Sequence, residues 1–427
     1  MDVQKKKKRI PVKSRVHRAQ RLILEDRETR YRAFVGGIGS GKTYTGCLDL
    51  IQTRADRSLV LAPTYPMLKD GALSLFLELF GALIRKHNKA FLKTELLDGR
   101  EILWRPADVN NLERLRGINA GYLWVDEGAS LTRKAWNVAI GRIRRTPGRA
   151  LVTTTPRGLN NWVHDVFVKE AGSSSSLVQC ATSENVWLPE GWIQSVRGQY
   201  TSRFALQELE GQFLEEDAQG LFDRQWFRVV ESAPETPSEA SVRHWDLAST
   251  SGPDSDWSAS ALLSRRSGRY TLTLERYRLS WLKPDRAGKC LKETIVQTAL
   301  ADGQDVQVSI EAVSGFEHSF EEISLDPRLQ GWRFRKVKPC KTKVARAMRL
   351  AAKAEAGLVC LVRNRASEPF LTEAEDFPKK GAKNDMVDAA SGAYNALRGG
   401  SGLQVGSTRP APGHEWTPQT RQERLQW

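Results

Sequence analysis

The chain has 427 residues, a formal net charge of +15 and a hydrophobic fraction of 40%. This length predicts two domains, or three, and the hydrophobic fraction is ample for folded cores, which excludes a wholly disordered chain. No apolar run approaches the roughly 18 residues of a membrane span, and no signal peptide opens the sequence. The positive charge predicts a polyanionic partner, with nucleic acid as the first candidate and an anionic membrane surface as the alternative.

The chain opens with a basic segment, residues 1–21, which we expect to be a flexible arm. It begins with the run Lys5-Lys6-Lys7-Lys8-Arg9 and continues with Lys13, Arg15, Arg18 and Arg21. Such a segment is either a solvated tail, an arm that lies on DNA phosphates, or a localisation signal. The five cysteines are scattered and form no C-x-x-C pair, so we expect reduced thiols in a cytosolic protein.

Residues 22–212 are expected to form a first α/β unit. Its apolar, strand-like runs alternate with helix-like stretches, which is typical of a parallel sheet with helices on both faces. The runs cover residues 32–35, 58–62, 121–125 and 149–153. Residues 213–240 are acidic and proline-containing, which predicts a linker with one short helix.

Residues 241–398 are expected to form a second α/β unit, and residues 399–427 a disordered tail. The second unit opens with strands, continues with further strands and ends in a helix at 384–397. The predicted strands cover residues 242–247, 257–264, 270–279, 306–311, 332–337 and 358–362.

A glycine-rich stretch follows the first predicted strand and fits the pattern G-x-x-x-x-G-K-[ST] at every position. Its sequence is Gly36-Gly37-Ile38-Gly39-Ser40-Gly41-Lys42-Thr43. The glycines let backbone N–H groups approach an anion, Lys42 would reach the β- and γ-phosphates, and Thr43 would hold Mg²⁺. We therefore expect a nucleotide-binding loop, with a ligand-free glycine turn as the alternative.

Two acids, Asp126 and Glu127, follow the strand at 121–125, at the end where parallel sheets bind ligands. Asp126 is expected to hold Mg²⁺ and Glu127 to orient or deprotonate the attacking water. The next strand ends in Thr153-Thr154-Thr155, which either couples loss of the γ-phosphate to motion or is an ordinary strand end.

Hydrolysis at such sites usually needs a further positive charge on the γ-phosphate, often from a neighbouring subunit. Arg116 ranks first because it lies with Gly117 shortly before the acidic strand. The other candidates are Arg100, Arg105 and Arg157. Each is otherwise an ordinary surface arginine.

In the second unit, three separated elements each bring a carboxylate to an edge of the sheet. Asp246 and Glu311 end strands, and Asp385 and Asp388 open the last helix on one face. Carboxylates in this arrangement hold two Mg²⁺ or Mn²⁺ ions about 4 Å apart. Asp256 is a further carboxylate beside the group. Each acid alone would be a strand end or a helix cap, but the set predicts a metal-dependent nuclease.

The order and spacing of these motifs, from about residue 30 to residue 397, resemble the large terminase subunit of tailed bacteriophages. A single motif would be a weak signal, but the ordered set is highly specific. The matching segments are 36–43, 61–64, 115–117, 124–127, 153–158, 210–213, 245–246, 256–259, 310–312 and 384–389.

The resemblance implies an N-terminal P-loop ATPase domain followed by a mixed-sheet nuclease domain similar to ribonuclease H. ATP hydrolysis would move double-stranded DNA into a procapsid, and two Mg²⁺ or Mn²⁺ ions would serve an endonuclease that cuts concatemeric DNA at initiation and termination. The implied partners are DNA, the phage portal protein, the small terminase subunit and further copies of the chain in a pentameric ring. The implied location is the cytoplasm of the infected host and transiently the procapsid portal.

Two departures from the family pattern affect the assignments. Ile38 occupies a position in the phosphate loop where the family often has a basic residue, and Asn384-Asp385 stands where it tends to have two aspartates. Asp385 is therefore the first choice as the ligand of that motif and Asp388 the second. The expected catalytic residues are Glu127, Arg116, Asp246, Glu311 and Asp385. The expected metal ligands are Thr43, Asp126, Asp246, Asp256, Glu311, Asp385 and Asp388.

The sequence thus predicts an ATP-driven DNA translocase joined to an endonuclease. One alternative is a DNA-binding P-loop regulator with an inert second domain, which would have no need for the convergent acids Asp246, Glu311 and Asp385. A membrane-surface protein that uses the basic arm is a further alternative, but the sequence offers no amphipathic anchor.

Overall fold

The structure is a computed structural model, and the chain in it divides into two compact units, Met1–Ala218 and Gln219–Trp427. It describes residues 15–108, 112–145, 148–215, 220–235, 237–248, 252, 255–311, 317–338, 342–379 and 381–398. The lysine run of the expected arm and the expected tail, residues 399–427, lie outside this part. None of the helices in the described ranges is long and apolar enough to cross a membrane.

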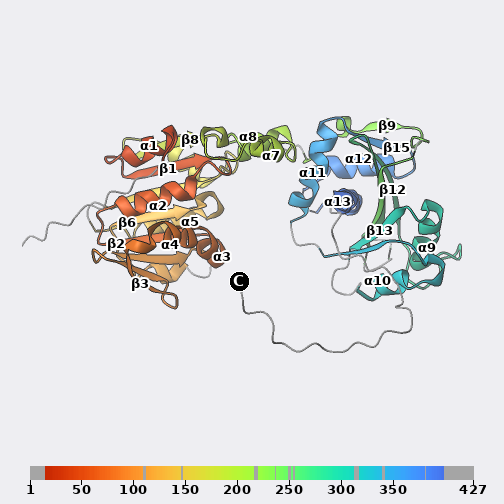
Figure 1. Ribbon diagram of the computed structural model, residues 1–427, viewed down its shortest axis with the longest axis horizontal. Helices are drawn as coiled ribbons and strands as arrows, with labels where there is room; N and C mark the ends of the chain where they lie inside the picture. The colour runs from red at the N-terminus through yellow and green to blue at the C-terminus, as the bar shows by residue number, and fades with distance from the viewer. Residues whose placement is uncertain are drawn as a thin grey trace, which may run out of the picture. The chain divides into compact units, whose positions relative to one another are not determined.

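The first unit is built on a sheet with the strand order β3-β4-β5-β2-β6-β7-β1-β8 (Figure 1). From β5 to β8 all neighbouring strands pair in parallel. At the other edge, β3, β4 and β5 pair in antiparallel fashion. The strands are β1 Tyr31–Gly36, β2 Arg57–Ala62, β3 Ile84–Asn88, β4 Lys93–Leu96, β5 Glu101–Pro106, β6 Tyr122–Asp126, β7 Arg149–Thr154 and β8 Ser175–Cys180. The four predicted strands form the centre of the sheet.

Helices cover both faces of this sheet, as the sequence predicts. Side chains of α1, α2 and α4 pack on one face against Phe34 and Trp124, and α5 packs on the other face against Val125 and Val152. Central strands buried on both sides need apolar residues at successive positions, which explains their continuous apolar runs. The helices are α1 Arg18–Glu25, α2 Lys42–Gln52, α3 Tyr65–Met67, α4 Ser74–Phe80, α5 Arg133–Ile140, α6 Trp162–His164, α7 Trp192–Arg197 and α8 Ser202–Glu208.

The flexible arm was predicted to extend to residue 21, but the structure shows that its last residues belong to a helix. Helix α1 begins at Arg18, with Ala19 and Ile23 buried in the core of the first unit. Burial of these apolar side chains fixes the C-terminal part of the basic segment, although Arg18 and Arg21 remain on its exposed side.

The second unit contains a mixed sheet with the strand order β14-β13-β10-β11-β12-β15-β9 (Figure 1). Strands β10, β11 and β12 are antiparallel neighbours, and the remaining pairs are parallel. The strands are β9 Arg228–Val230, β10 Ala240–Asp246, β11 Ser258–Arg266, β12 Arg269–Tyr277, β13 Val306–Glu311, β14 Phe334–Val337 and β15 Val359–Val362. All six predicted strands are present.

Helices α11, α12 and α13 pack on one face of this mixed sheet, and α9 and α10 pack on the other. Their bounds are α9 Leu291–Asp302, α10 Glu317–Ser324, α11 Lys343–Glu355, α12 Ser367–Asp376 and α13 Asp385–Arg398. Helix α13 is the predicted helix at 384–397, and it lies centrally against the sheet, where it contacts β10 and β11.

Part of the predicted linker, residues 213–240, belongs to the fold of the second unit. Strand β9 pairs with β15, and Phe222 and Phe227 are buried in the core beneath α12 and α13. Because two large aromatic side chains are buried there, this part of the range is an element of the domain. Polar and charged residues surround Phe222 and Phe227 in the sequence, so no apolar pattern indicated their burial.

Candidate active sites

The predicted phosphate loop connects β1 to α2, and its glycines are required by its geometry. Gly39 and Gly41 have φ angles of 76° and 83°, in the left-handed region that side chains other than glycine rarely adopt. A Cβ atom on Gly37 would lie 2.3 Å from the Thr182 hydroxyl. The loop therefore has the compact backbone that binds phosphate groups in proteins with this motif.

The segment after β8 holds the loop from one side. The Thr182 hydroxyl donates to the carbonyl oxygen of Ile38 at 2.8 Å, and the Asn185 amide donates to that of Gly39 at 2.7 Å. Sequence reasoning missed both residues because strand β8, which places them beside β1, carries no strong apolar pattern.

Two residues at the start of α1 hold the other end of the loop. His17 Nε2 donates to the carbonyl oxygen of Ser40 at 3.0 Å, and the Gln20 amide donates to that of Gly41 at 3.2 Å. With its carbonyl groups held in this way, the loop is fixed before any ligand binds. These residues lie in the segment that was expected to be a flexible arm.

Lys42 is buried at the start of α2, and its ammonium group donates to the carbonyl oxygen of Gly37 at 2.9 Å. Burial lowers the pKa of Lys42, while the nearby Glu127 and Asp126 raise it. A cation in this position is oriented by the loop itself and can exchange its carbonyl partner for a phosphate oxygen.

Asp126 and Thr43 meet as the sequence predicts. Asp126 Oδ1 accepts hydrogen bonds from the hydroxyls of Thr43, at 3.3 Å, and Thr153, at 2.7 Å. Burial and the adjacent Glu127 raise the pKa of Asp126 to about 7. A buried carboxylate beside a hydroxyl is a donor set that suits Mg²⁺, which would also stabilise the ionised form of Asp126.

Glu127 follows Asp126 with a φ angle of 52°, which is unusual for a residue with a side chain. Such strain costs about 1–3 kcal/mol and is concentrated at functional sites. The charges of Lys42, Glu127 and Arg157 each shift the pKa of Glu208. These four charged side chains therefore lie close to one another. Sequence reasoning missed Glu208, whose pKa is raised by burial.

The predicted coupling threonines are tied to the acidic strand. The Thr153 hydroxyl accepts from the Trp124 indole at 2.8 Å and donates to Asp126. The Thr154 hydroxyl accepts from the backbone N–H of Ala129 at 3.0 Å and donates to the carbonyl oxygen of Thr155 at 2.8 Å. Strand β7 is thereby bonded to Asp126, the predicted metal ligand, and to Ala129 in the turn that follows Asp126.

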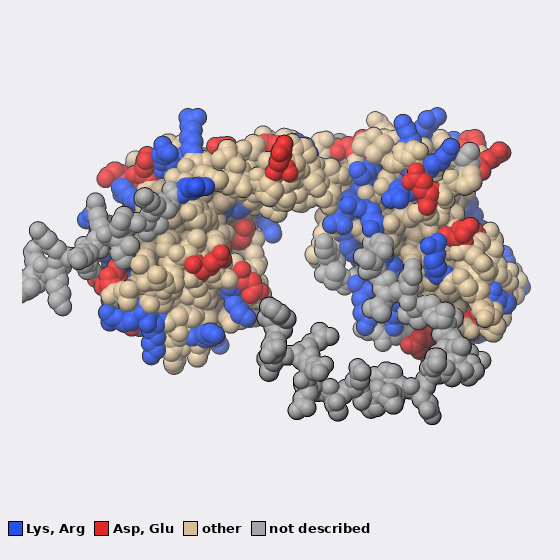
Figure 2. Space-filling view, viewed as in Figure 1, with Lys and Arg blue, Asp and Glu red and all other residues tan. Residues whose placement is uncertain are grey.

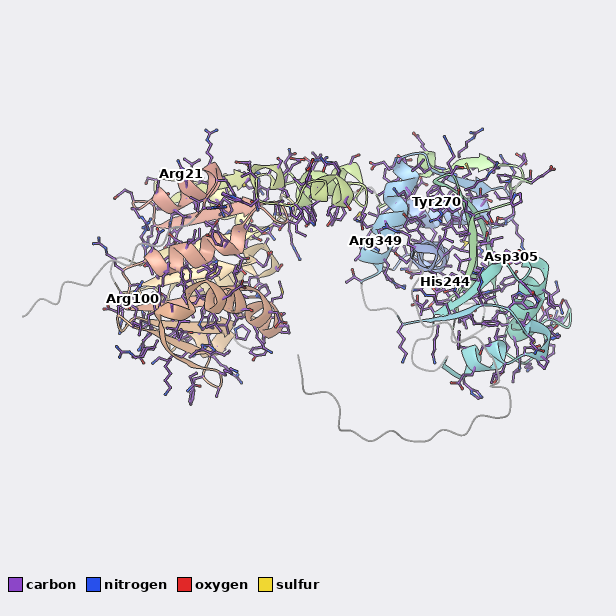
Figure 3. The ribbon with its side chains drawn as sticks, viewed as in Figure 1. Arg21, Arg100, His244, Tyr270, Asp305 and Arg349 are labelled. Carbon is purple, nitrogen blue, oxygen red and sulfur yellow. The ribbon has the colours of Figure 1, made fainter. Side chains whose placement is uncertain are left out.

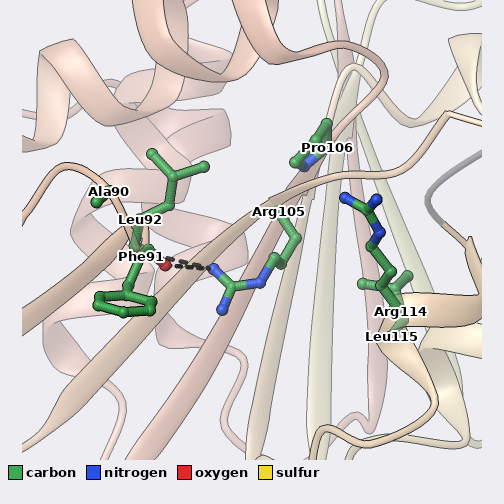
Figure 4. Close-up of a pocket in the computed structure, with 7 residues that line it drawn as sticks. All are labelled: Ala90, Phe91, Leu92, Arg105, Pro106, Arg114 and Leu115. Atoms are coloured by element: carbon green, nitrogen blue, oxygen red, sulfur yellow. Dashed lines mark hydrogen bonds between the residues drawn. The ribbon is translucent and has the colours of Figure 1, made fainter.

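The candidate arginines have different surroundings. Arg100 donates to the carbonyl oxygens of Ile51 and Thr53, at the end of α2 opposite the phosphate loop (Figure 3). Arg105 lines a pocket of about 310 Å³ and donates to the carbonyl oxygens of Phe91 and Leu92 (Figure 4). Both guanidinium groups are thus bonded to backbone carbonyl oxygens of their own unit.

The two remaining arginines are compatible with a catalytic role. Arg116 is exposed and pairs with the equally exposed Glu113 at 2.5 Å, a contact of little energetic weight. The charge of Arg157 lowers the pKa of Glu208. Because the carbonyl oxygen of Glu208 accepts from the backbone N–H of Ile38, Arg157 lies near the phosphate loop of its own chain.

In the second unit, the predicted carboxylates converge. Asp246 and Glu311 end the adjacent parallel strands β10 and β13, in which Trp245 is paired with Ile310. Burial, followed by the charges of Glu311, Asp388 and Asp385, raises the pKa of Asp246 well above its ordinary value. Protons or cations relieve repulsion of this kind, and a pair of divalent metal ions fits the all-oxygen donor set.

Two basic residues of α11, which sequence reasoning missed, reach into this cluster. Arg346 donates to Glu311 at 2.6 Å and to Asp388 at 3.3 Å. Lys343 pairs with Asp388 and donates to the side-chain oxygen of Asn384 at 2.7 Å. The spacing of Lys343 and Arg346 places them on one face of the helix, a weak signal that many surface helices share.

Asp385 and Asp256 both lie near Trp257, but they differ in how deeply they are buried. Asp385 Oδ2 accepts from the backbone N–H of Trp257 at 2.9 Å, and burial raises the pKa of Asp385. The side chain of Asp256 is 66% exposed and pairs with Lys383. Asp256 therefore lies at the rim of the cluster, whereas Asp385 lies inside it.

Two further buried residues support the cluster. Glu373 accepts from the backbone N–H of Val387 at 2.8 Å in the first turn of α13, and burial raises the pKa of Glu373 to about 7. His244, on β10 (Figure 3), bonds the Ser309 hydroxyl at 2.9 Å, and burial lowers the pKa of His244 to about 3, so it is neutral. Gly392 leaves room for its ring, because a Cβ there would lie 2.2 Å from it.

The first unit thus combines a phosphate loop with a strand-end acid pair, and the second unit combines a mixed sheet with a cluster of acids. Residues 33–229 match the family model of the terminase large subunit, T4likevirus-type, N-terminal. The resemblance to large terminase subunits that the sequence motifs indicate is thus confirmed, and so is the predicted fold class.

Solved structures agree with this fold over most of the chain. The large terminase of a thermophilic bacteriophage superposes with a TM-score of 0.58 at 14% identity, covering 90% of this chain and 99% of that one. The same terminase in complex with ATP-gamma-S has a TM-score of 0.56 at 14% identity, covering 88% and 98% of the two chains. Comparison with curated protein sequences gives no significant match.

Proposed function

We propose that this chain is the motor and nuclease subunit of a viral genome-packaging machine. ATP hydrolysis in the first unit drives double-stranded DNA into a procapsid, and the second unit cuts concatemeric DNA at initiation and termination. The observation that carries this proposal is the presence, in one chain with the large terminase fold, of two separate sites. One is the phosphate loop with Thr43 and Asp126, and the other is the acid cluster around Asp246.

The residues of the first site have distinct roles in ATP hydrolysis. Thr43 and Asp126 would hold Mg²⁺, which would neutralise part of the phosphate charge. Lys42 exchanges its bond to Gly37 for the β- and γ-phosphates, and Glu127 orients and deprotonates the attacking water. The ATP-gamma-S complex of the related phage terminase supports ATP as the nucleotide.

Loss of the γ-phosphate is communicated through Thr153. Its hydroxyl joins Asp126 on β6 to β7, so a shift of the Asp126 side chain would displace the threonine segment. Because packed strands move in discrete steps, such a displacement can be passed to the rest of the unit.

Arg116 is our choice for the charge supplied by a neighbouring copy of the chain. Its exposure leaves it accessible, and its pair with Glu113 is easily exchanged. Arg157 is the choice within the same chain. A ring of five copies docked on the portal, with a monomer in free solution, is the assembly that the terminase resemblance implies.

In the second unit, Asp246, Glu311 and Asp385 hold two Mg²⁺ or Mn²⁺ ions, with Asp388 as a further ligand and Asp256 at the rim. Such ions would supply activated water and charge for the leaving oxygen of the cleaved phosphodiester. Lys343 and Arg346 orient Asp388 and Glu311 and limit the repulsion within the cluster.

The proposed partners are DNA, the portal protein and the small terminase subunit, in the cytoplasm of the infected host. Lysine and arginine side chains occur on the visible surfaces of both units (Figure 2), in keeping with the net charge of +15. Such charge grips DNA through its phosphates without reading sequence, as a translocating motor requires.

An ATPase assay and a plasmid nicking assay on the full chain test this proposal directly. We expect ATP hydrolysis that depends on Mg²⁺, and nicking with Mg²⁺ or Mn²⁺ that chelation abolishes. A protein that hydrolyses ATP but never nicks DNA at saturating Mn²⁺ would be a translocase or regulator with an inert second unit.

A further inference from the structure

Three side chains with metal-binding atoms converge behind the phosphate loop, and none of them belongs to the sets of residues proposed to bind ATP or the nuclease metals. They are His17, Cys180 and Glu184, whose ligand atoms all lie within 4.8 Å of one another. His17 precedes α1, Cys180 ends β8, and Glu184 follows four residues later, where α1 and β8 lie side by side (Figure 1). None of the three has a role in the function proposed above.

His17 presents an unpartnered nitrogen. Its Nε2 is bonded to the carbonyl oxygen of Ser40, which can only accept, so Nε2 carries the proton and Nδ1 has a free lone pair. That Nδ1 atom is buried and makes no hydrogen bond, although the residue is 9% exposed. Buried polar atoms normally have partners, and metal-bound histidines typically donate their other N–H to a carbonyl or carboxylate, as His17 does.

The other two groups have complementary features. The Cys180 side chain is buried, and burial followed by the charge of Glu184 raises the pKa of its thiol to about 12. Glu184 is held in place by the backbone N–H of Ala181, which donates to its Oε1 atom at 3.1 Å. Glu184 is the least buried of the three residues, so the cluster opens toward solvent on its side.

We propose that Nδ1 of His17, Sγ of Cys180 and a carboxylate oxygen of Glu184 form a binding site for a divalent transition metal, with Zn²⁺ as the best fit. Nitrogen, sulfur and oxygen ligands together suit Zn²⁺ and exclude Mg²⁺ and Ca²⁺, which prefer oxygen alone. Zinc bonds of about 2.0–2.3 Å place tetrahedral ligand atoms roughly 3.3–3.8 Å apart, so the three atoms need to close by about 1 Å.

Rotation of the Glu184 side chain, the least buried of the three, would contribute to this closure at the expense of its bond to the Ala181 N–H, and water would complete the fourth position. Binding replaces the S–H bond of Cys180 by a metal–thiolate bond and releases one proton to solvent. No electron transfer is involved.

A metal here would clamp the nucleotide loop. His17 donates to Ser40 near one end of the loop, and the carbonyl oxygen of Cys180 accepts from the backbone N–H of Gly37 at 3.1 Å near the other. One ion would therefore join α1, β8 and both ends of the loop. Its expected effect is to stabilise the first unit.

Titration of the metal-stripped full chain with Co²⁺ in excess Mg²⁺ tests the site. We expect a thiolate-to-cobalt charge-transfer band that saturates at one equivalent, disappears on addition of Zn²⁺ and accompanies the release of one proton. The acid cluster of the second unit offers only oxygen ligands and cannot produce this band. Cys180→Ala should abolish the band, whereas Cys47→Ala, which removes another buried thiol of the same unit, should leave it intact.

Two further variants keep the test decisive if Cys180→Ala does not fold. Glu184→Gln, on the side that opens toward solvent, and His17→Gln should each weaken Co²⁺ binding by at least about tenfold. Zn²⁺ should also raise the melting temperature of the wild-type chain more than that of either variant. Absence of the band in the wild-type chain, its persistence in Cys180→Ala, or unchanged affinity in both other variants would overturn the proposal.

Discussion

The hydroxyl of Thr153 donates to Oδ1 of Asp126 at 2.7 Å, which links the end of β7 to the predicted metal-binding carboxylate at the end of β6. The same hydroxyl accepts from the Trp124 indole, and all three side chains are buried. Thr153 thus supports the proposed ATPase site and is well placed to respond when the charge at Asp126 changes.

Replacing Thr153 by valine should slow ATP hydrolysis and leave DNA nicking unchanged, because Asp126 loses a hydrogen bond that fixes its orientation. The Trp124 indole would also lose its acceptor, which should lower the free energy of unfolding by about 1–3 kcal/mol. Steady-state ATPase assays and thermal unfolding check both effects, with Thr94→Val as the matched control, because the buried Thr94 hydroxyl on β4 likewise accepts from an indole, that of Trp104, at 2.9 Å. Equal ATPase rates in the two variants would refute the coupling role of Thr153.

Replacing Glu127 by glutamine should preserve ATP binding and reduce hydrolysis at least about 100-fold, the scale of losing a catalytic base. Nucleotide binding measured by calorimetry separates this effect from misfolding, and Glu78→Gln on the exposed side of α4 serves as control. If Glu127→Gln fails to bind ATP, the residue has a structural role instead.

Replacing Arg346 by glutamine should destabilise the metal-free second unit by about 3 kcal/mol, because Glu311 and Asp388 would lose a largely buried cation. Mn²⁺ should restore much of this loss, since the ions supply the missing positive charge. Urea unfolding with chelator and with Mn²⁺ measures the difference, and Arg349→Gln, one turn further along α11 (Figure 3), is the control. A loss that Mn²⁺ does not reduce would show that Arg346 only fills space.

The pKa of Glu373, raised to about 7, predicts a pH dependence of stability. Because the folded-state pKa lies above the unfolded value of about 4.3, the protonated form favours folding, and stability is lost as the pH rises from about 4.5 through 7. The loss attributable to Glu373 amounts to about 4 kcal/mol at most. Glu373→Gln should flatten this slope in urea unfolding at pH 5 and pH 8 with chelator present, and an unchanged slope would assign it to other groups.

The sequence predicts the central strands and the principal acids of both sites because each depends on a local pattern. The phosphate loop needs glycines at fixed positions, and Asp126, Asp246 and Glu311 directly follow apolar strands. In these cases the chemistry and the element that places it are adjacent in the chain.

The residues that sequence reasoning missed act across long separations. Thr182 and Asn185 reach the phosphate loop only because β8 pairs with β1, and Arg346 reaches Glu311 only because α11 packs over the sheet. Hydrogen-bonding side chains of this kind are common on any surface, so nothing in the local pattern distinguishes them. The basic residues Arg18 and Arg21 led to the prediction of a flexible arm, although the apolar residues between and after them belong to the buried side of α1.

The central claim, that one chain carries two independent hydrolytic sites, is tested most directly by Lys42→Ala and Asp246→Asn in the full-length protein. ATP hydrolysis and plasmid nicking are measured on the same preparations of both variants. The account predicts that Lys42→Ala loses ATP hydrolysis and still nicks DNA, and that Asp246→Asn loses nicking and still hydrolyses ATP. ATP hydrolysis near the wild-type rate in Lys42→Ala, or nicking by Asp246→Asn at saturating Mn²⁺, would contradict it.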